Sequence, residues 1–163
     1  MAITKLVSDS LGTGVGGKVL QVVSVTKDST FTTTSGTFVD VTGLSASITP
    51  SSASNKIAVL YNVSLSNTTS TAATLTRLLR DSTPISIGAS GTGVQASGHV
   101  AINDFNQGNV SISYLDSPST TSAITYKVQI KTEPGYTATL NRGQLTSNYG
   151  LTASTITLME VSA

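Results

Sequence analysis

Two glycine-rich stretches have the spacing of a phosphate-binding loop. The matching residues are Gly12, Gly14 and Gly17 in the first stretch and Gly91, Gly93 and Ala96 in the second. This motif binds a pyrophosphate only where it follows a strand and opens a helix, because the helix N-terminus supplies the amide donors. The first stretch precedes an expected strand, and no helical pattern follows the second. We therefore interpret the two stretches as a linker and a loop, and we expect no cofactor.

His99 is the only histidine of the chain. A Ser-His-Asp site would place it beside a nucleophile and a carboxylate. Ser90 sits between Gly88 and Gly91, but this spacing does not match the G-x-S-x-G elbow of hydrolases. We therefore interpret His99 as a loop or interface histidine and predict no catalytic residue.

The carboxylates do not form an obvious catalytic or metal-binding set. Glu133 and Glu160 are the only glutamates, and each lies in or beside an expected strand or turn. Asn103, Asp104 and Asn106 carry oxygen donors but lack the spacing of a calcium loop, so a polar turn is the better interpretation. The chain has no cysteine, which excludes disulfides and thiolate sites. We predict no metal site and no enzymatic activity.

The amino-acid composition argues against nucleic acid and membrane as partners of this chain. Ser and Thr fill about a third of the chain, whereas charged residues make up 10% and the formal net charge is +1. Phosphate recognition needs clustered Lys and Arg, so nucleic acid is not expected as a partner. No run approaches the length of a membrane helix, and residues 1–11 lack the apolar core of a signal peptide. We expect a chain made in the cytosol, without a membrane span, and with a surface of hydroxyls rather than charges.

Two segments carry a large apolar residue at every second position without a break, which is the pattern of a strand with one buried face. We predict that their apolar side chains form the core: Ile57, Val59, Tyr61, Val63, Leu65, Ile124, Tyr126, Val128 and Ile130. Tyr114 belongs to a third alternating segment and is expected to be buried too. Carbohydrate sites on sandwiches usually present exposed aromatic rings, and the chain has no Trp.

The remaining strand candidates complete an all-β architecture. Residues 19–26 form a continuous apolar-rich run, which indicates a strand covered on both faces or placed at a subunit contact. Residues 37–41 and 44–49 are expected as two short strands separated by Thr42 and Gly43. Roughly eight to ten strands with Gly, Pro, Ser and Asn turns predict an antiparallel β-sandwich, jelly-roll-like, over residues 18–163.

Residues 1–17 are predicted to form an N-terminal arm and a Gly-rich linker outside the sandwich. The apolar residues Ile3, Leu6, Val7 and Leu11 are spaced like a helical stripe and precede the glycines. One interpretation is a frayed terminus. The other, which we favour, is an arm whose apolar residues bind a neighbouring molecule.

Several segments resemble marine phage and cyanophage structural proteins. They are GKVLQVV (17–23), FVDVTGL (38–44), SITPSSASNKI (47–57), YLDSP (114–118), TYKVQ (125–129) and ITLMEV (156–161). The resemblance spans most of residues 17–163. It rests on strand and turn motifs, so it bears on fold and setting rather than on chemistry.

The resemblance implies a virion protein made in the host cytoplasm, in a group that includes tail-fibre segments, head decorations and capsid cement proteins. Such proteins are often trimeric β-sandwiches, so we expect a homotrimer that binds the major capsid protein or other virion proteins. Only a short arm precedes the sandwich, which favours decoration or cement. The alternative is a tail fibre, spike or adaptor, for which a host-surface glycan is the expected partner.

Overall fold

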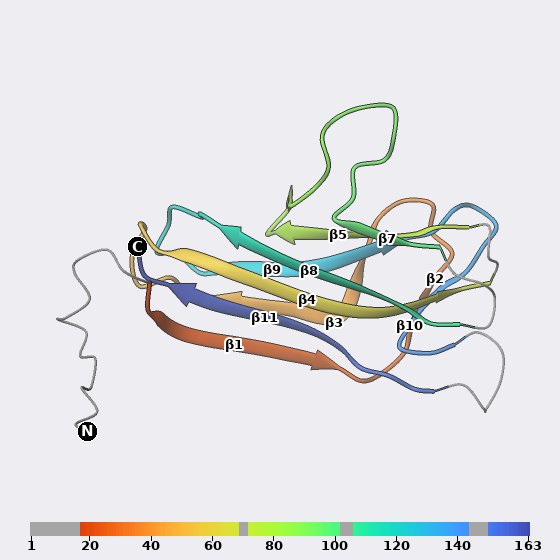
Figure 1. The fold of residues 1–163 in the computed structure, drawn as a ribbon, viewed down its shortest axis with the longest axis horizontal. Helices are drawn as coiled ribbons and strands as arrows, with labels where there is room; N and C mark the ends of the chain where they lie inside the picture. Colours follow the sequence, from red (N-terminus) through yellow and green to blue (C-terminus); the bar gives the residue numbers. More distant parts are fainter. Residues whose placement is uncertain (1–16, 69–71, 102–105, 144–149) are drawn as a thin grey trace, which may run out of the picture.

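A computed structural model describes residues 17–68, 72–101, 106–143 and 150–163 (Figure 1). Within these ranges the chain forms eleven strands and no helix. The strands are β1 (Val19–Lys27), β2 (Phe31–Thr33), β3 (Val39–Ile48), β4 (Lys56–Asn67), β5 (Thr74–Arg80), β6 (Thr83–Ile85), β7 (Gly98–Val100), β8 (Gly108–Asp116), β9 (Ile124–Lys131), β10 (Ala138–Leu140) and β11 (Ser154–Val161).

The strands form two antiparallel sheets that pack face to face. Sheet A has six strands in the order β1-β11-β4-β10-β2, with β8 paired to the other side of β4. Sheet B has five strands in the order β3-β9-β5-β6, with β7 also paired to β5. Figure 1 looks onto sheet A, with β1, β11, β4 and β8 in front of β3 and β9.

The strand order is that of a jelly roll. The chain crosses from β1 in sheet A to β3 in sheet B, returns to β4, and crosses again to β5. The second half repeats this pattern through β8, β9 and β11, so that β11 inserts between β1 and β4 while β9 inserts between β3 and β5. Two interleaved Greek keys of this kind define the jelly roll, and the predicted fold class is therefore confirmed.

The core lies between the sheets and contains the nine residues that the two clearest strand candidates assigned to it, whereas the expected burial of Tyr114 is only partial. The nine predicted core side chains, from β4 and β9, are all at most 3% exposed. Leu44 of β3, Leu78 of β5 and Leu158 of β11 join them at 0% exposure. Tyr114 of β8 is only half-buried at the edge of this cluster, because β8 is the last strand of sheet A and has a neighbour on one side only.

Sequence alone divided β3 wrongly into two strands. Its pairing with β9 continues through the segment, with a register shift between Asp40 and Ser45. Gly43 lies inside the shift with φ +83°, a conformation that costs glycine little and other residues much. Thr42 and Gly43 therefore form an irregularity within one strand rather than a turn between two.

One edge of sheet B is interrupted by a loop. Strands β6 and β7 pair with successive parts of β5, at Leu78–Ile85 and Thr76–Gly98, so residues 86–97 leave and rejoin what is otherwise one strand. Ser97 closes the loop: its amide donates to the Thr76 carbonyl at 2.8 Å, and its Oγ accepts from the Leu78 amide at 2.9 Å. The loop projects from the sandwich in Figure 1 (green).

Candidate interaction surface

The side chains of β1, β11, β4 and β8 that point away from the core form one continuous surface, which we call the β1–β8 face. Its position follows from alternation, because from Val22 onwards its residues alternate along each strand with residues that point inward. The face consists of Val19, Val22, Ser24, Thr26, Lys56, Ala58, Leu60, Asn62, Ser111, Ser113, Leu115, Thr155, Thr157, Met159 and Val161.

This face carries almost no charge. Lys56 is its only ionisable side chain, at the start of β4. Its middle is covered by hydroxyls and an amide that bond across the strands: Ser24 Oγ and Thr157 Oγ1 lie 2.9 Å apart, and Asn62 Nδ2 donates to Ser111 Oγ at 2.5 Å. These hydroxyl and amide groups partly satisfy one another within the sheet.

One row across the face is entirely apolar. Cross-strand pairing aligns Val22 with Met159, Met159 with Ala58, and Ala58 with Leu115. Neighbouring strands lie about 4.8 Å apart, so the row crosses all four strands over about 14 Å. Val22 is 56% exposed and Leu115 is 51% exposed, so both ends of the row meet solvent.

A shallow groove of about 470 Å³ adjoins this row. Leu60 and Met159 supply its apolar wall, and hydroxyls of β8 and β11 supply the polar one. No Asp, Glu, His, Lys or Arg side chain lines the groove, and burial raises the pKa of its one phenol, Tyr61, to about 12, so the groove offers contact surface and neutral hydrogen bonds.

Strand β1 borders the β1–β8 face and ends sheet A on one side. It pairs with β11 on one edge, and no strand of the described chain pairs with its other edge. Of the two sequence-based interpretations of residues 19–26, a strand covered on both faces is wrong for the single chain. Only its inward side chains, such as Val23 and Val25, pack on the core.

The outer side of sheet B, which we call the ladder face, is charged and internally paired. Asp40 of β3 accepts hydrogen bonds from Lys127 Nζ at 2.7 Å and from Gln129 Nε2 at 2.6 Å. Arg77 of β5 bonds to the Gln129 amide oxygen and lies 3.9 Å from the centroid of the Phe38 ring. The hydrogen bond from Lys127 lowers the pKa of the Asp40 carboxyl, with Gln129 contributing.

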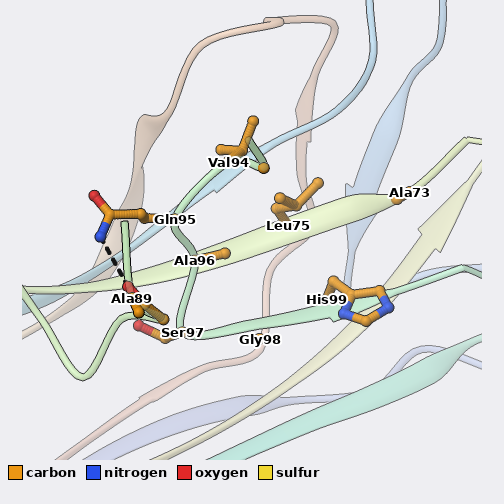
Figure 2. Close-up of a pocket in the computed structure, with 11 residues that line it drawn as sticks. Ala73, Leu75, Ala89, Val94, Gln95, Ala96, Ser97, Gly98 and His99 are labelled. Atoms are coloured by element: carbon orange, nitrogen blue, oxygen red, sulfur yellow. Dashed lines mark hydrogen bonds between the residues drawn. The ribbon is translucent and has the colours of Figure 1, made fainter. Parts of the chain in front are cut away.

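A second hollow, of about 430 Å³, lies under the loop of residues 86–97 (Figure 2). Leu75 of β5 forms part of its floor, while Val94 and Ala96 come from the loop. Gln95 bonds to the Gly88 carbonyl at 2.8 Å at one end, and His99 stands at the other end. His99 is the only ionisable residue among the lining residues, which gives the hollow no acid–base pair.

The most unusual buried group is Glu160, whose side chain points inward from β11 and is 1% exposed. Its carboxylate accepts hydrogen bonds from Gln21 Nε2 at 2.6 Å, from Asn55 Nδ2 at 2.6 Å, and from the amide and Oγ of Ser51 at 2.7 Å each. Burial alone would raise the pKa of this carboxyl, but the donors of Asn55, Gln21 and Ser51 lower it to about 2. The carboxylate thereby ties β1, β11 and the turn after β3 together.

A second buried carboxylate joins the two sheets. Asp116 of β8 accepts two hydrogen bonds from Arg80 at 3.0 Å and one from the Tyr126 hydroxyl at 2.7 Å. Burial and the Asp116 carboxylate both raise the pKa of the Tyr126 hydroxyl, which therefore stays protonated and donates. Every member of this group has a partner inside the molecule, which makes it a structural cross-link.

The residues singled out in the sequence fall in different places. Ile3, Leu6, Val7 and Leu11 lie outside the described residues. Gly91, Gly93 and Ala96 belong to the loop of residues 86–97, as expected, and His99 lies exposed on β7. Among the described residues no group of three His, Cys, Asp or Glu side chains is placed to hold a metal ion. The described chain also lacks any helix long and apolar enough to cross a membrane.

Two features were missed by sequence reasoning. The buried role of Glu160 was detectable, because Ile156, Leu158 and Glu160 share one face of β11 by alternation. The β1–β8 face was not, because its row combines residues from four strands that are distant in the chain.

No family model matches the chain, and no curated protein matches it. Several solved structures of viral particles align with most of this chain at low identity. The Gx strain of infectious bursal disease virus aligns with a TM-score of 0.48 and 12% identity, over 88% of this chain and 37% of that chain. The VP2 subviral particle of that virus aligns with a TM-score of 0.47 and 14% identity, over 88% of this chain and 37% of that chain. The T13 particle of the same virus aligns with a TM-score of 0.45 and 15% identity, over 88% of this chain and 36% of that chain. This chain thus spans little more than a third of each of those chains.

Proposed function

We propose that this chain is a non-enzymatic structural protein of a bacteriophage virion, and that it decorates or cements the head by binding the major capsid protein. The observation that carries the proposal is the β1–β8 face. It combines one lysine, a hydroxyl-covered centre and an exposed apolar row. Such a surface suits contact with protein, since exposed apolar patches mark interaction sites.

The resemblance of the strand and turn motifs to phage structural proteins supports the same role. A jelly roll hosts many functions, so the fold does not decide between them. The buried carboxylates support a structural role, because Glu160 and Asp116 are fully engaged in cross-links between strands. A catalytic carboxylate would instead face a cleft.

We further propose that the protein acts as a homotrimer and that its N-terminal arm helps to hold it on the particle. The warrant is the sequence of the arm, in which Ile3, Leu6, Val7 and Leu11 precede a run rich in glycine. Burying four such side chains stabilises a contact by roughly 1.5–3 kcal/mol each, before the cost of ordering the arm. Deleting residues 1–11 should leave the sandwich folded and weaken incorporation into particles. Full-strength incorporation of the truncated chain would identify the arm as a frayed end.

The second candidate is a tail fibre, spike or adaptor that takes part in host attachment. The loop of residues 86–97 favours it, since the loop projects from sheet B and covers a hollow beside His99. A host-surface glycan is the ligand expected for that role.

Cryo-electron microscopy of the virion separates the two candidates by copy number and position. Hundreds of copies spread over the head support decoration or cement. A few copies at one vertex or along the tail support the second candidate. Absence of the chain from purified particles would overturn both.

A further inference from the structure

The exposed apolar side chains of the described chain are concentrated in one region. Seven large hydrophobic residues are exposed in the described chain, and five of them lie on strands of sheet A. They are Val19, Leu20 and Val22 on β1, Leu60 on β4 and Leu115 on β8. Four of these five belong to the β1–β8 face, and Leu20 sits at the register shift of β1 beside it. Single exposed apolar residues scattered over a surface are ordinary, but a group of them in one region indicates a surface that a partner covers.

The edge of β1 that pairs with no strand of the described chain continues this region. The strand is nine residues long, and its only charged residue is Lys27 at its far end. Natural sheets protect long edges with charges, proline or a covering segment, because unpaired backbone groups promote association with another chain. The first eight residues of β1 contain neither a charge nor a proline. The edge and the face therefore form one corner that is open to a partner.

The low charge of this corner indicates what kind of partner can bind it. A nucleic acid or a strongly charged protein would be recognised by a cluster of opposite charges, whereas the β1–β8 face offers only Lys56. A second copy of the same surface meets it without strong repulsion, and neutral hydroxyls bond equally well to their own kind. The ladder face, with Lys127, Lys131 and Arg77 against Asp40, would repel its own copy more strongly.

The size of the face agrees with contact between copies. Four strands at about 4.8 Å spacing and eight or nine residues at about 3.3 Å give an area on the order of 500 Å². Two copies meeting through it would bury on the order of 1,000 Å², which is where specific interfaces begin. The β1 edge adds to that area.

We propose that copies of this chain contact one another through the β1–β8 face and the adjoining edge of β1, with the row Val22–Met159–Ala58–Leu115 at the centre of the contact. The inference deepens the proposed function, because it names a surface that joins copies of the virion protein in pairs, and hence one homotrimer to the next, and it rests on that function for its biological setting.

The chain allows a direct test, since it contains no cysteine. Single variants Val22→Cys and Leu115→Cys place a thiol at each end of the row, and Ser45→Cys places a matched exposed thiol on the outer side of sheet B. A short bis-maleimide should join two chains through Val22→Cys or Leu115→Cys at least roughly tenfold more efficiently than through Ser45→Cys, because only the first two lie in the contact. Equal yields at all three positions would overturn the proposal.

Charge substitution gives an independent measurement. The double variant Val22→Lys/Leu115→Lys should weaken self-association in sedimentation velocity on the order of tenfold or more, since like charges across an interface are costly. The control pair Ser45→Lys/Ser47→Lys should leave it within about twofold, as expected for sites outside the interface. The substituted residues are exposed, so unchanged melting temperatures verify that all variants are folded. A protein that remains monomeric at every concentration would sink the proposal.

Other occupants of the face give different products. In the double variant Leu6→Cys/Val22→Cys, an intrachain cross-link without any interchain product would show that the chain's own arm covers the row. A cross-link from Val22→Cys to another virion protein in assembled particles, without chain–chain product, would assign the row to the shell. Either result overturns the proposal. Loss of the proposed virion role is seen separately, as absence of the chain from particles, and leaves the self-association result standing.

Discussion

The β1–β8 face and the ladder face are built by the same alternation on two sheets that share one core, yet they present different chemistry. On the ladder face, Asp40, Lys127 and Gln129 bond to one another, and Arg77 covers the Phe38 ring. On the β1–β8 face, the row of Val22, Met159, Ala58 and Leu115 has no covering group in the described chain.

The difference separates outward residues that have partners within the chain from outward residues that have none in the described chain. Outward positions contribute little to the core, so their identity reflects what they touch outside it. The ladder face provides its own partners and can remain in water. The β1–β8 face leaves apolar surface exposed beside an edge of β1 that pairs with no strand of the described chain, and such a surface favours association with a partner.

The two sides of a single strand offer the strongest test of this division. Leu158 of β11 points into the core and is 0% exposed, while the next residue, Met159, points onto the β1–β8 face. Leu158→Ala should lower the free energy of unfolding by about 2–5 kcal/mol, because it removes buried methyl groups and leaves a cavity. Met159→Ala should cost about 0.5–1 kcal/mol. Urea denaturation measures both, and similar losses would contradict the assigned orientation of β11.

The next largest effect is expected at Glu160, which connects the corner of the β1–β8 face to the turn after β3. Glu160→Gln keeps the shape of the side chain but sets an amide donor against the donors of Gln21, Asn55 and Ser51. A cost of about 1–3 kcal/mol is expected, since buried polar groups lose their partners. Glu133→Gln, at an exposed position, is the matched control and should be close to neutral.

The contribution of Glu160 to stability should depend on pH. The folded pKa of Glu160 is about 2, below its ordinary value of 4.5, so its ionised form is favoured by folding. Its contribution is therefore fully present above pH 4.5 and is lost as the pH falls from 4.5 towards 2. Thermal melting of the wild type across this window should fall more steeply than that of Glu160→Gln. Parallel curves for the two proteins would show that the carboxylate does not carry this pH dependence.

Strict alternation made the core predictable. In β4 and in β9 the inward apolar residues recur at every second position without a break, and all nine residues they supplied are buried. The same rule failed at β3, where Gly43 adopts φ +83° and shifts the register, because a local irregularity reverses the faces without leaving a clear pattern in the sequence. It also could not anticipate that β6 and β7 are one strand divided by a long loop.

The candidate surface was only partly accessible from the sequence. The apolar run of residues 19–26 indicated that β1 needs a cover or a partner, but not which. Leu115 and Ala58 became neighbours only through the pairing of β8 with β4, since they are far apart along the chain. The arm residues Ile3, Leu6, Val7 and Leu11 remain a prediction.

The smallest expected effect lies on the ladder face. Lys127 and Asp40 lie 2.7 Å apart, but the Asp40 side chain is 50% exposed, so solvent screens the pair. In a double-mutant cycle of Lys127→Met and Asp40→Asn, the coupling should be about 0.2–1 kcal/mol at low salt and should shrink in 1 M salt. The hydrogen bond from Lys127 lowers the Asp40 pKa, so the coupling is present above pH 3.8 and fades as acid protonates Asp40.

Lys56→Met on the opposite face is the matched control, because Lys56 forms no ion pair with any described residue. Combined with Asp40→Asn, it should show no coupling, since the two residues lie on opposite sides of the sandwich. Lys56→Met should instead leave stability nearly unchanged while strengthening self-association, because it removes the only charge from the β1–β8 face. Equal coupling of both lysines to Asp40 would indicate a general charge effect. It would contradict the distinction between the ladder face, whose charged groups bond to one another within the chain, and the β1–β8 face, whose apolar row is left for a second copy.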